Sequence, residues 1–169
     1  MQDTPTVTTH IFTPDQPYTD VLALQEQAVD DVYRQNAGQQ LYIGQHAPVY
    51  TAGTSAADVD YLGGNDIPVV KTGRGGKFTY HGPGQIVAYP ILDLRPRQRD
   101  LRAYICDLQK WLITSLKECG IEAYTRDEVG VWVDKPEGPA KIAAIGVRVR
   151  RWITFHGIAL NVEPDLSHY

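Results

Sequence analysis

Helical periodicity is confined to two segments of this sequence, and this limits the architectures that the chain can adopt. The first segment covers residues 18–37, where Gly38 can end a helix. The second begins after Asp100, a residue that favours the N-cap position, and extends to Cys119, just before Gly120. The predicted apolar faces are Val21, Leu24, Ala28 and Val32 in the first helix, and Leu101, Ile105, Leu108, Leu112 and Leu116 in the second.

The rest of the chain divides into short runs of β-branched, aromatic and aliphatic residues that are typical of strands. Residues 141–149 and 152–162 predict a hairpin, with Arg150 and Arg151 near its bend. The apolar alternation breaks near Gly146, so we expect a face change or a bulge there. Two helices among many short strands indicate an α+β domain and not repeated βαβ units. The other predicted strands cover residues 8–12, 40–43, 48–51, 67–71, 85–91 and 129–133.

Size and composition are those of an ordinary globular chain. Its 169 residues fit a single domain covering residues 1–169, with 43% hydrophobic and 21% charged residues. A net charge of −4 argues against a nucleic-acid-binding protein. No apolar run approaches the roughly 20 residues of a membrane span, and no signal peptide is visible. The two cysteines form no paired motif, so we expect a reducing cytoplasm as the location.

The most unusual stretch is RGGKFTYHGPGQ, residues 74–85. We predict a loop here, because its glycines allow positive φ angles and a close approach of the backbone to a ligand. The hydrogen-bonding and aromatic side chains suit a ligand with a carbonyl-like end and an apolar body. A structural hairpin is the main alternative. An RNA-binding element and a phosphate cradle are disfavoured, because the RGG is single, the chain is acidic and no phosphate-loop motif is present.

His81 within this stretch and four side chains outside it are candidates for chemistry. Lys141 opens the apolar run KIAAIGV and is either a solvated charge or a lysine beside a pocket, where burial would lower its pKa. His81 and His156 each precede a glycine, and they are either core residues or members of one pocket. Cys106 and Cys119 fall on the second predicted helix and at its C-terminal end, so both are predicted to be structural thiols. The remaining histidines have no metal-type spacing.

Two long segments in one order, with the short GVWV between them, resemble the lipoyl/octanoyl transferases of bacterial lipoate assembly. The long segments are RGGKFTYHGPGQIVAYPILDL and KIAAIGVRVRRWITFHGIALNVEPDL, and HAPVYTAGTSA before them fits an early segment of the family. The resemblance covers residues 40–166. It implies the α+β fold of lipoate and biotin protein ligases, with mixed or antiparallel sheets flanked by helices. It also implies transfer of an octanoyl group through a cysteine thioester, without a metal or other cofactor.

The resemblance assigns roles to residues of this sequence. It identifies Lys141 as the lysine that lowers the pKa of the reacting thiol, which reverses the preference for a solvated charge. The implied partners are octanoyl acyl carrier protein as donor, and as acceptors the lipoyl domains of 2-oxoacid dehydrogenases and the glycine-cleavage carrier protein. The implied acyl-binding residues are Arg74, Gly75, Gly76, Lys77, Phe78, Thr79, Tyr80, His81, Ala144, Ile145, Gly146, Gly157, Ile158 and Ala159.

The reacting cysteine of the family lies in a Pro-Cys-Gly context shortly after the segment that matches NVEPDLSHY. Neither Cys106 nor Cys119 matches it. We therefore expect that the sequence continues beyond residue 169; an inactive relative is the alternative. An ATP-dependent lipoate ligase and a non-enzymatic acyl-binding module are the other hypotheses, although no phosphate-cradling motif supports the ligase.

Basic residues offer a hypothesis for partner docking, because acyl carrier and lipoyl domains are generally acidic. The arginines gather in two groups, and each group is either a docking surface or a solvated face. The groups are Arg95, Arg97, Arg99 and Arg102, and Arg148, Arg150 and Arg151.

Overall fold

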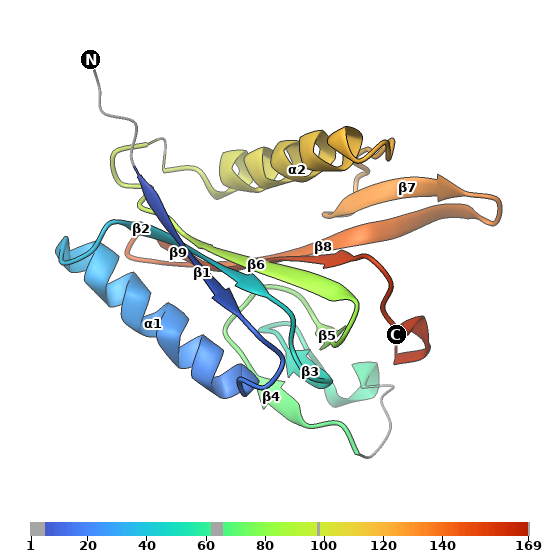
Figure 1. The fold of residues 1–169 in the computed structure, drawn as a ribbon, viewed down its shortest axis with the longest axis horizontal. Coiled ribbons are helices and arrows are strands. Elements are labelled where there is room, and N and C mark those ends of the chain that lie inside the picture. The colour runs from blue at the N-terminus through green and yellow to red at the C-terminus, as the bar shows by residue number, and fades with distance from the viewer. Residues whose placement is uncertain (1–5, 62–65, 98, 169) are drawn as a thin grey trace.

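The computed structural model describes residues 6–61, 66–97 and 99–168. Its centre is a six-stranded sheet with one long helix on each face (Figure 1). In spatial order the strands are β1 (Val7–Phe12), β2 (Gln39–Gly44), β6 (Gln85–Ile91), β9 (Ile153–Asn161), β8 (Gly138–Arg150) and β7 (Val131–Lys135). Strands β1 and β2 are parallel, and the other neighbours are antiparallel.

A second, three-stranded sheet lies beside the first (Figure 1). Its spatial order is β4 (Val69–Lys71), β3 (Val49–Ala52) and β5 (Phe78–His81). Strand β5 shows that the prediction of a loop over residues 74–85 is wrong for the middle of that stretch. Aromatic and β-branched side chains favour a strand there, and the backbone pairs antiparallel with β3. Two short 3₁₀ helices, Asp58–Asp60 and Leu166–His168, are also present.

Helix α1 (Tyr18–Arg34) covers one face of the large sheet. It ends before the predicted Gly38, because Gln35 takes the left-handed conformation with φ of 62°. The amide of Asn36 then bonds to the carbonyl oxygen of Asp31 at 2.9 Å, which closes the helix. The predicted apolar face is also wrong at one position. Leu24 is 44% exposed, whereas Gln25 is fully buried.

Helix α2 (Leu101–Glu118) covers the opposite face. Asp100 is its N-cap, as predicted, and its side chain accepts hydrogen bonds from the amides of Arg102 and Ala103. Leu108, Leu112 and Leu116 are buried as expected, but Leu101 is 42% exposed. The buried residue in the first turns is instead Tyr104.

The predicted hairpin is confirmed as β8 and β9. Arg151 and Trp152 form its turn with φ angles of 54° and 65°, so both central residues are left-handed, as in type I′ turns. The bulge expected near Gly146 is not present: Gly146 pairs with Gly157 in an unbroken register. The irregularity lies on the other edge of β8, where the register with β7 shifts between Val131 and Trp132.

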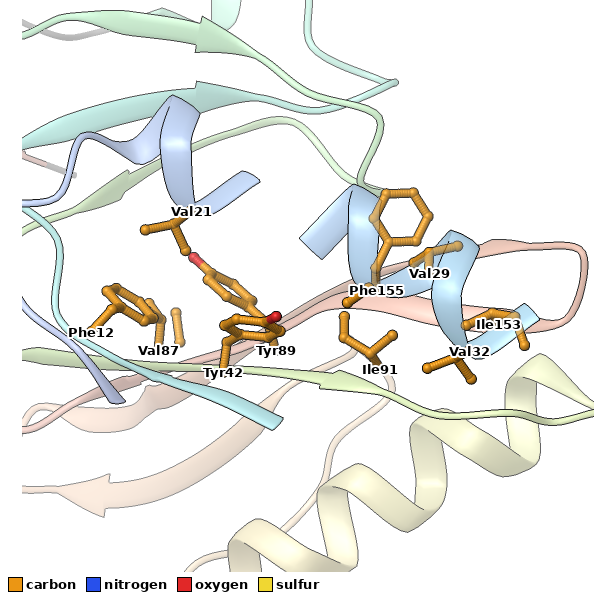
Figure 2. Close-up of a cluster of buried hydrophobic side chains, with 12 residues drawn as sticks. Phe12, Val21, Val29, Val32, Tyr42, Val87, Tyr89, Ile91, Ile153 and Phe155 are labelled. Carbon is orange, nitrogen blue, oxygen red and sulfur yellow. The ribbon is translucent and has the colours of Figure 1, made fainter. Parts of the chain in front are cut away.

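A core cluster fills the space between α1 and the large sheet (Figure 2). Val21, Val29 and Val32 of α1 meet residues of β6 and β9, among them Tyr89 and Phe155. Among the described residues, no helix is both long and apolar enough to cross a membrane. The predicted α+β class is confirmed.

Candidate active site

A cavity of about 670 Å³ lies where β8 runs past the end of β7. The pairing with β7 reaches only Ala143, so the next residues of β8 are open to the RGG segment. The amide of Gly75 donates a hydrogen bond to the carbonyl oxygen of Val147 at 3.2 Å, which ties the two segments together. Apolar side chains dominate the far wall, including those of Leu101, Ile105 and Ile158. This volume lies within the range of small-molecule sites, about 300–1,000 Å³.

The structure brings together residues that the sequence places in three separate motifs. Residues 74–79, His81, residues 144–146 and residues 157–159 all line the cavity, and so does Lys141. Tyr80 is the exception among the residues named from the sequence, because it does not line the cavity. Its ring stacks on His168 with centroids 4.4 Å apart and meets Tyr50 edge to face at 5.5 Å.

Arg74 organises the RGG segment. Its guanidinium is buried and donates five hydrogen bonds, to the hydroxyl and carbonyl oxygens of Thr51 and to the carbonyl oxygens of Gly75 and Lys77. Within the described ranges no carboxylate pairs with Arg74. Burial lowers its pKa from the usual range, but an arginine stays charged. The cavity wall therefore holds a positive charge without a counter-ion.

A group of aromatic and imidazole rings lies beside Arg74, and no local sequence pattern indicated most of its members. Tyr18 stacks on His81, and His46 lies beside both, with its ring centroid 4.8 Å from Tyr18 and 6.0 Å from His81. His46 Nε2 lies 2.9 Å from the hydroxyl of Tyr89, which lines the cavity. His81 Nδ1 lies 2.6 Å from Oε1 of Gln85.

Both buried imidazoles are neutral near pH 7. Burial, and after it the neighbouring His81, lowers the pKa of His46 to about 3. Burial also lowers the pKa of His81 to about 4; the hydrogen bond that His81 donates to Oε1 of Gln85 opposes this shift, and Arg74 adds to it. Burial raises the pKa of Tyr18 to about 12, so its hydroxyl keeps its proton.

His156 lines the same cavity as His81. Of the two alternatives left open by the sequence, core residues or members of one pocket, the structure therefore shows one pocket. It is 2% exposed and has a φ angle of 55°. Burial, followed by the charges of Arg74 and Arg148, lowers the pKa of His156 to about 4.

Lys141 lies at the cavity and not on a solvated edge. Its Nζ forms an ion pair with the carboxylate of Glu128 and lies over the ring of Trp132, 5.0 Å from the centroid. Its side chain is 29% exposed. Glu128 also lines the cavity, and nothing in the local sequence pattern indicated this role.

The two cysteines do not line the cavity. Cys106 and Cys119 are both free and exposed, the first on α2 and the second at its C-cap. No group of three or more histidine, cysteine, aspartate or glutamate side chains within residues 6–61, 66–97 and 99–168 could hold a metal ion.

Several of the candidate docking arginines are already paired. Arg95 forms an ion pair with Asp93 at 2.7 Å. Arg150 and Arg151 both approach Asp30, at 3.3 Å and 3.9 Å. These contacts reduce the charge that the two groups present to a partner.

The sequence of this chain is similar to proteins of known family. Residues 17–169 match the family model described as the lipoyl protein ligase A/B catalytic domain. The chain belongs to this family. Within the lipoyl protein ligase A/B family, it is 49% identical over 163 residues to the octanoyltransferase of Chelativorans sp. (strain BNC1) and 52% identical over 155 residues to that of Maricaulis maris (strain MCS10). Another octanoyltransferase, from Brucella melitensis, is 49% identical over 162 residues.

These alignments cover 90% of this chain but only part of each relative. The chain spans 66% of the Chelativorans protein, 61% of the Brucella protein and 69% of the Maricaulis protein. It therefore spans about two thirds of the length of the curated relatives that it matches.

Solved structures confirm the fold. The bipartite lipoate protein ligase of Thermoplasma acidophilum, studied with its E2 lipoyl domain, has a TM-score of 0.73 at 19% identity and covers 96% of this chain and 64% of its own. Lipoate-protein ligase A bound with ATP has a TM-score of 0.65 at 18% identity, with 96% and 68% covered. At these identities the likeness concerns the fold alone.

Proposed function

We propose that the protein is an octanoyltransferase of protein lipoylation. It takes an octanoyl group from octanoyl acyl carrier protein and transfers it to a lysine of a lipoyl domain, in 2-oxoacid dehydrogenases or the glycine-cleavage carrier protein. The observation that carries the proposal is the single cavity that joins the RGG segment, residues 144–146, residues 157–159 and Lys141. Identity of about half to octanoyltransferases over 90% of the chain supports the same reaction.

The cavity suits a medium-length acyl chain. Ile145 and Ile158 from the sheet, with Leu101 and Ile105 from α2, offer an apolar wall for the hydrocarbon. At about 0.8 kcal/mol per buried carbon, the seven saturated carbons of an octanoyl group contribute up to roughly 5 kcal/mol. The glycines at 75, 76, 146 and 157 let the backbone approach the carbonyl end closely.

The proposed reaction has two acyl transfers. A cysteine thiolate attacks the thioester carbonyl of the donor, an acyl–cysteine bond forms, and the carrier thiolate leaves. The amine of the acceptor lysine then attacks, the C–N bond forms, the C–S bond breaks, and the amine proton passes to the cysteine sulfur. Lys141 is the cation that favours the thiolate. We propose that the cysteine belongs to the Pro-Cys-Gly segment expected after residue 169, since Cys106 and Cys119 do not line the cavity.

The test is acylation of the full-length protein by octanoyl acyl carrier protein in the absence of ATP. Intact mass is expected to show one added octanoyl group, and hydroxylamine is expected to remove it, as for a thioester. Lys141→Ala should slow the acylation at least tenfold. Lys135→Ala is the matched control, because Lys135 is exposed on β7 and lies outside the cavity.

Each other outcome selects a different function. Equal acylation of Lys141→Ala and the unchanged protein would remove the role of Lys141. Transfer that requires free octanoate and ATP would identify a ligase. Octanoyl binding without a covalent product, in a protein of verified full length, would identify an acyl-binding module.

A further inference from the structure

His156 is a buried imidazole whose ring has no hydrogen-bond partner in the part of the chain that the structure describes. It lies in β9 opposite Val147 and lines the cavity. Both ring nitrogens are buried, and neither bonds to any residue that the structure describes. Buried polar groups are almost always hydrogen-bonded, because an unpaired donor or acceptor has lost its bonds to water. A ring with both nitrogens unpaired at a cavity wall therefore points to a ligand group that completes it.

The backbone at this residue is held in an unusual conformation. The φ angle of His156 is 55°, a left-handed value that costs free energy for any residue except glycine. The side chain of Gln25 in α1 holds it there, since its Oε1 accepts the amide hydrogen of His156 at 2.9 Å. The ring stacks on Phe155, with centroids 4.9 Å apart. Strain and an unpaired ring at one residue are typical of a functional position.

The ring is neutral, and this limits what it can do. The charged and titratable groups around it are Arg74, Arg148 and His81, which oppose its protonation together with burial and hold its pKa near 4. Such an imidazole is a poor base at pH 7, where a general base works best with a pKa near that pH. In its neutral form one nitrogen carries a hydrogen and can donate it without a change of charge.

Two other donors in the lining of the cavity are already used. The guanidinium of Arg74 makes five hydrogen bonds to Thr51 and the RGG backbone. The amide of Gly75 donates to Val147. The imidazole of His156, by contrast, is a side-chain donor at this cavity with no partner among the described residues.

We infer that the neutral His156 imidazole donates a hydrogen bond to the acyl carbonyl oxygen of the bound thioester and stabilises the oxyanion that forms on attack. This makes His156 a catalytic residue for the thioester end of a medium-chain acyl substrate. The inference rests on the proposed function. No bond to His156 forms or breaks, and its proton stays on the ring throughout.

The experiment compares two variants in the full-length protein. His156→Gly removes the ring and suits the left-handed backbone, so the fold is expected to survive, which thermal unfolding will check. His156→Asn keeps a side-chain donor and also tolerates this conformation. Single-turnover acylation by octanoyl acyl carrier protein measures the rate and the half-saturating concentration. His10→Asn is the control, because His10 is exposed on β1.

We expect His156→Gly to lower the maximal rate by about 10²–10³-fold, the usual loss for one oxyanion donor, with little change in half-saturation. His156→Asn should recover part of the rate. Added imidazole should raise the rate of His156→Gly and leave the unchanged protein unaffected. Above pH 6, the pH dependence of the rate of the unchanged protein should show no step from ionisation of His156.

The outcomes separate this inference from the proposed function. If the unchanged full-length protein is not acylated at all, the proposed function fails and this inference falls with it. If the unchanged protein is acylated and His156→Gly reacts within twofold of it, only the inference fails, and an ordered water is then the partner of the ring. The rate of the unchanged protein could instead fall as the pH drops through 6 to 7, while the rate of His156→Asn does not. His156 would then act as a base, and its role as a hydrogen-bond donor would be wrong.

Discussion

Arg74 Nη2 donates hydrogen bonds to both oxygens of Thr51, at 2.6 Å to the carbonyl and 2.8 Å to the hydroxyl. Thr51 lies in the central strand of the small sheet and is fully buried. The contact fixes the RGG segment to that sheet. It also solves the problem of a buried guanidinium without a carboxylate, because oxygen acceptors replace the lost water.

Thr51→Val should therefore destabilise the protein by about 1–3 kcal/mol. The substitution keeps the shape of the side chain but leaves donors of Arg74 without an acceptor in a buried site. Thr51→Ser, which keeps the hydroxyl, should lose less. Urea unfolding of the three proteins measures the difference, and a Thr51→Val protein within 0.5 kcal/mol of the unchanged one, about the scatter of surface substitutions, would refute the role given to this contact.

Glycine at position 157 is required by packing between strands. A Cβ there would clash with the carbonyl oxygen of Ala88 and lie 2.8 Å from Cδ of Pro90, both in β6. Gly157→Ala should thus destabilise the protein by about 1–3 kcal/mol or more, because a backbone atom cannot move aside cheaply. At Gly75 the nearest atom would be 3.7 Å away, so Gly75→Ala is the matched control and should be tolerated. Equal melting temperatures for the two variants would contradict this account.

The parts of this fold that the sequence predicted well are those set by local chemistry. Asp100 capped α2 as expected, because its carboxylate bonds to amides only two and three residues away. The motif segments line one cavity, and their role in acyl binding stays a prediction. The β8–β9 turn lay at the expected place, next to Arg150.

The parts that the sequence could not predict depend on contacts between distant residues. Gln25 is buried in place of Leu24 because it bonds to a backbone amide 131 residues away. Tyr80 does not line the cavity, because it pairs directly with Tyr50 in the register of β5 and β3, and its ring meets Tyr50 and His168. No local pattern signals such pairings.

The orientation of α1 can be tested at two adjacent residues. Gln25→Ala should cost about 1–3 kcal/mol of stability, because it leaves the amide of His156 unpaired in a buried site. Leu24→Ala should cost less than about 0.5 kcal/mol, since Leu24 lies on the exposed side and alanine favours helix. Urea unfolding of the two variants measures both losses of stability. If Leu24→Ala lost more stability than Gln25→Ala, the apolar face predicted from the sequence would be correct.

The buried histidines should make the protein sensitive to mild acid. Burial lowers the pKa of His46 to about 3 and those of His81 and His156 to about 4, whereas an unfolded histidine titrates near 6.5. The unfolded state therefore takes up protons first, so stability is full above about pH 6.5 and falls as the pH drops toward 4. Between pH 6.5 and 5 each histidine can remove up to about 2 kcal/mol. Aspartates with lowered pKa values, such as Asp60 and Asp93, contribute only at lower pH.

Urea unfolding at pH 7.5 and pH 5.0 measures this loss, and we expect a decrease of at least about 2 kcal/mol in the free energy of unfolding. His46→Gln should reduce the difference between the two pH values, because glutamine can still bond to the hydroxyl of Tyr89 but cannot take up a proton. His10→Gln is the control: His10 is exposed, and its loss should leave the pH dependence unchanged. Equal stability at the two pH values would mean that the three imidazoles become protonated without unfolding, and that the site is more open to water than its burial indicates.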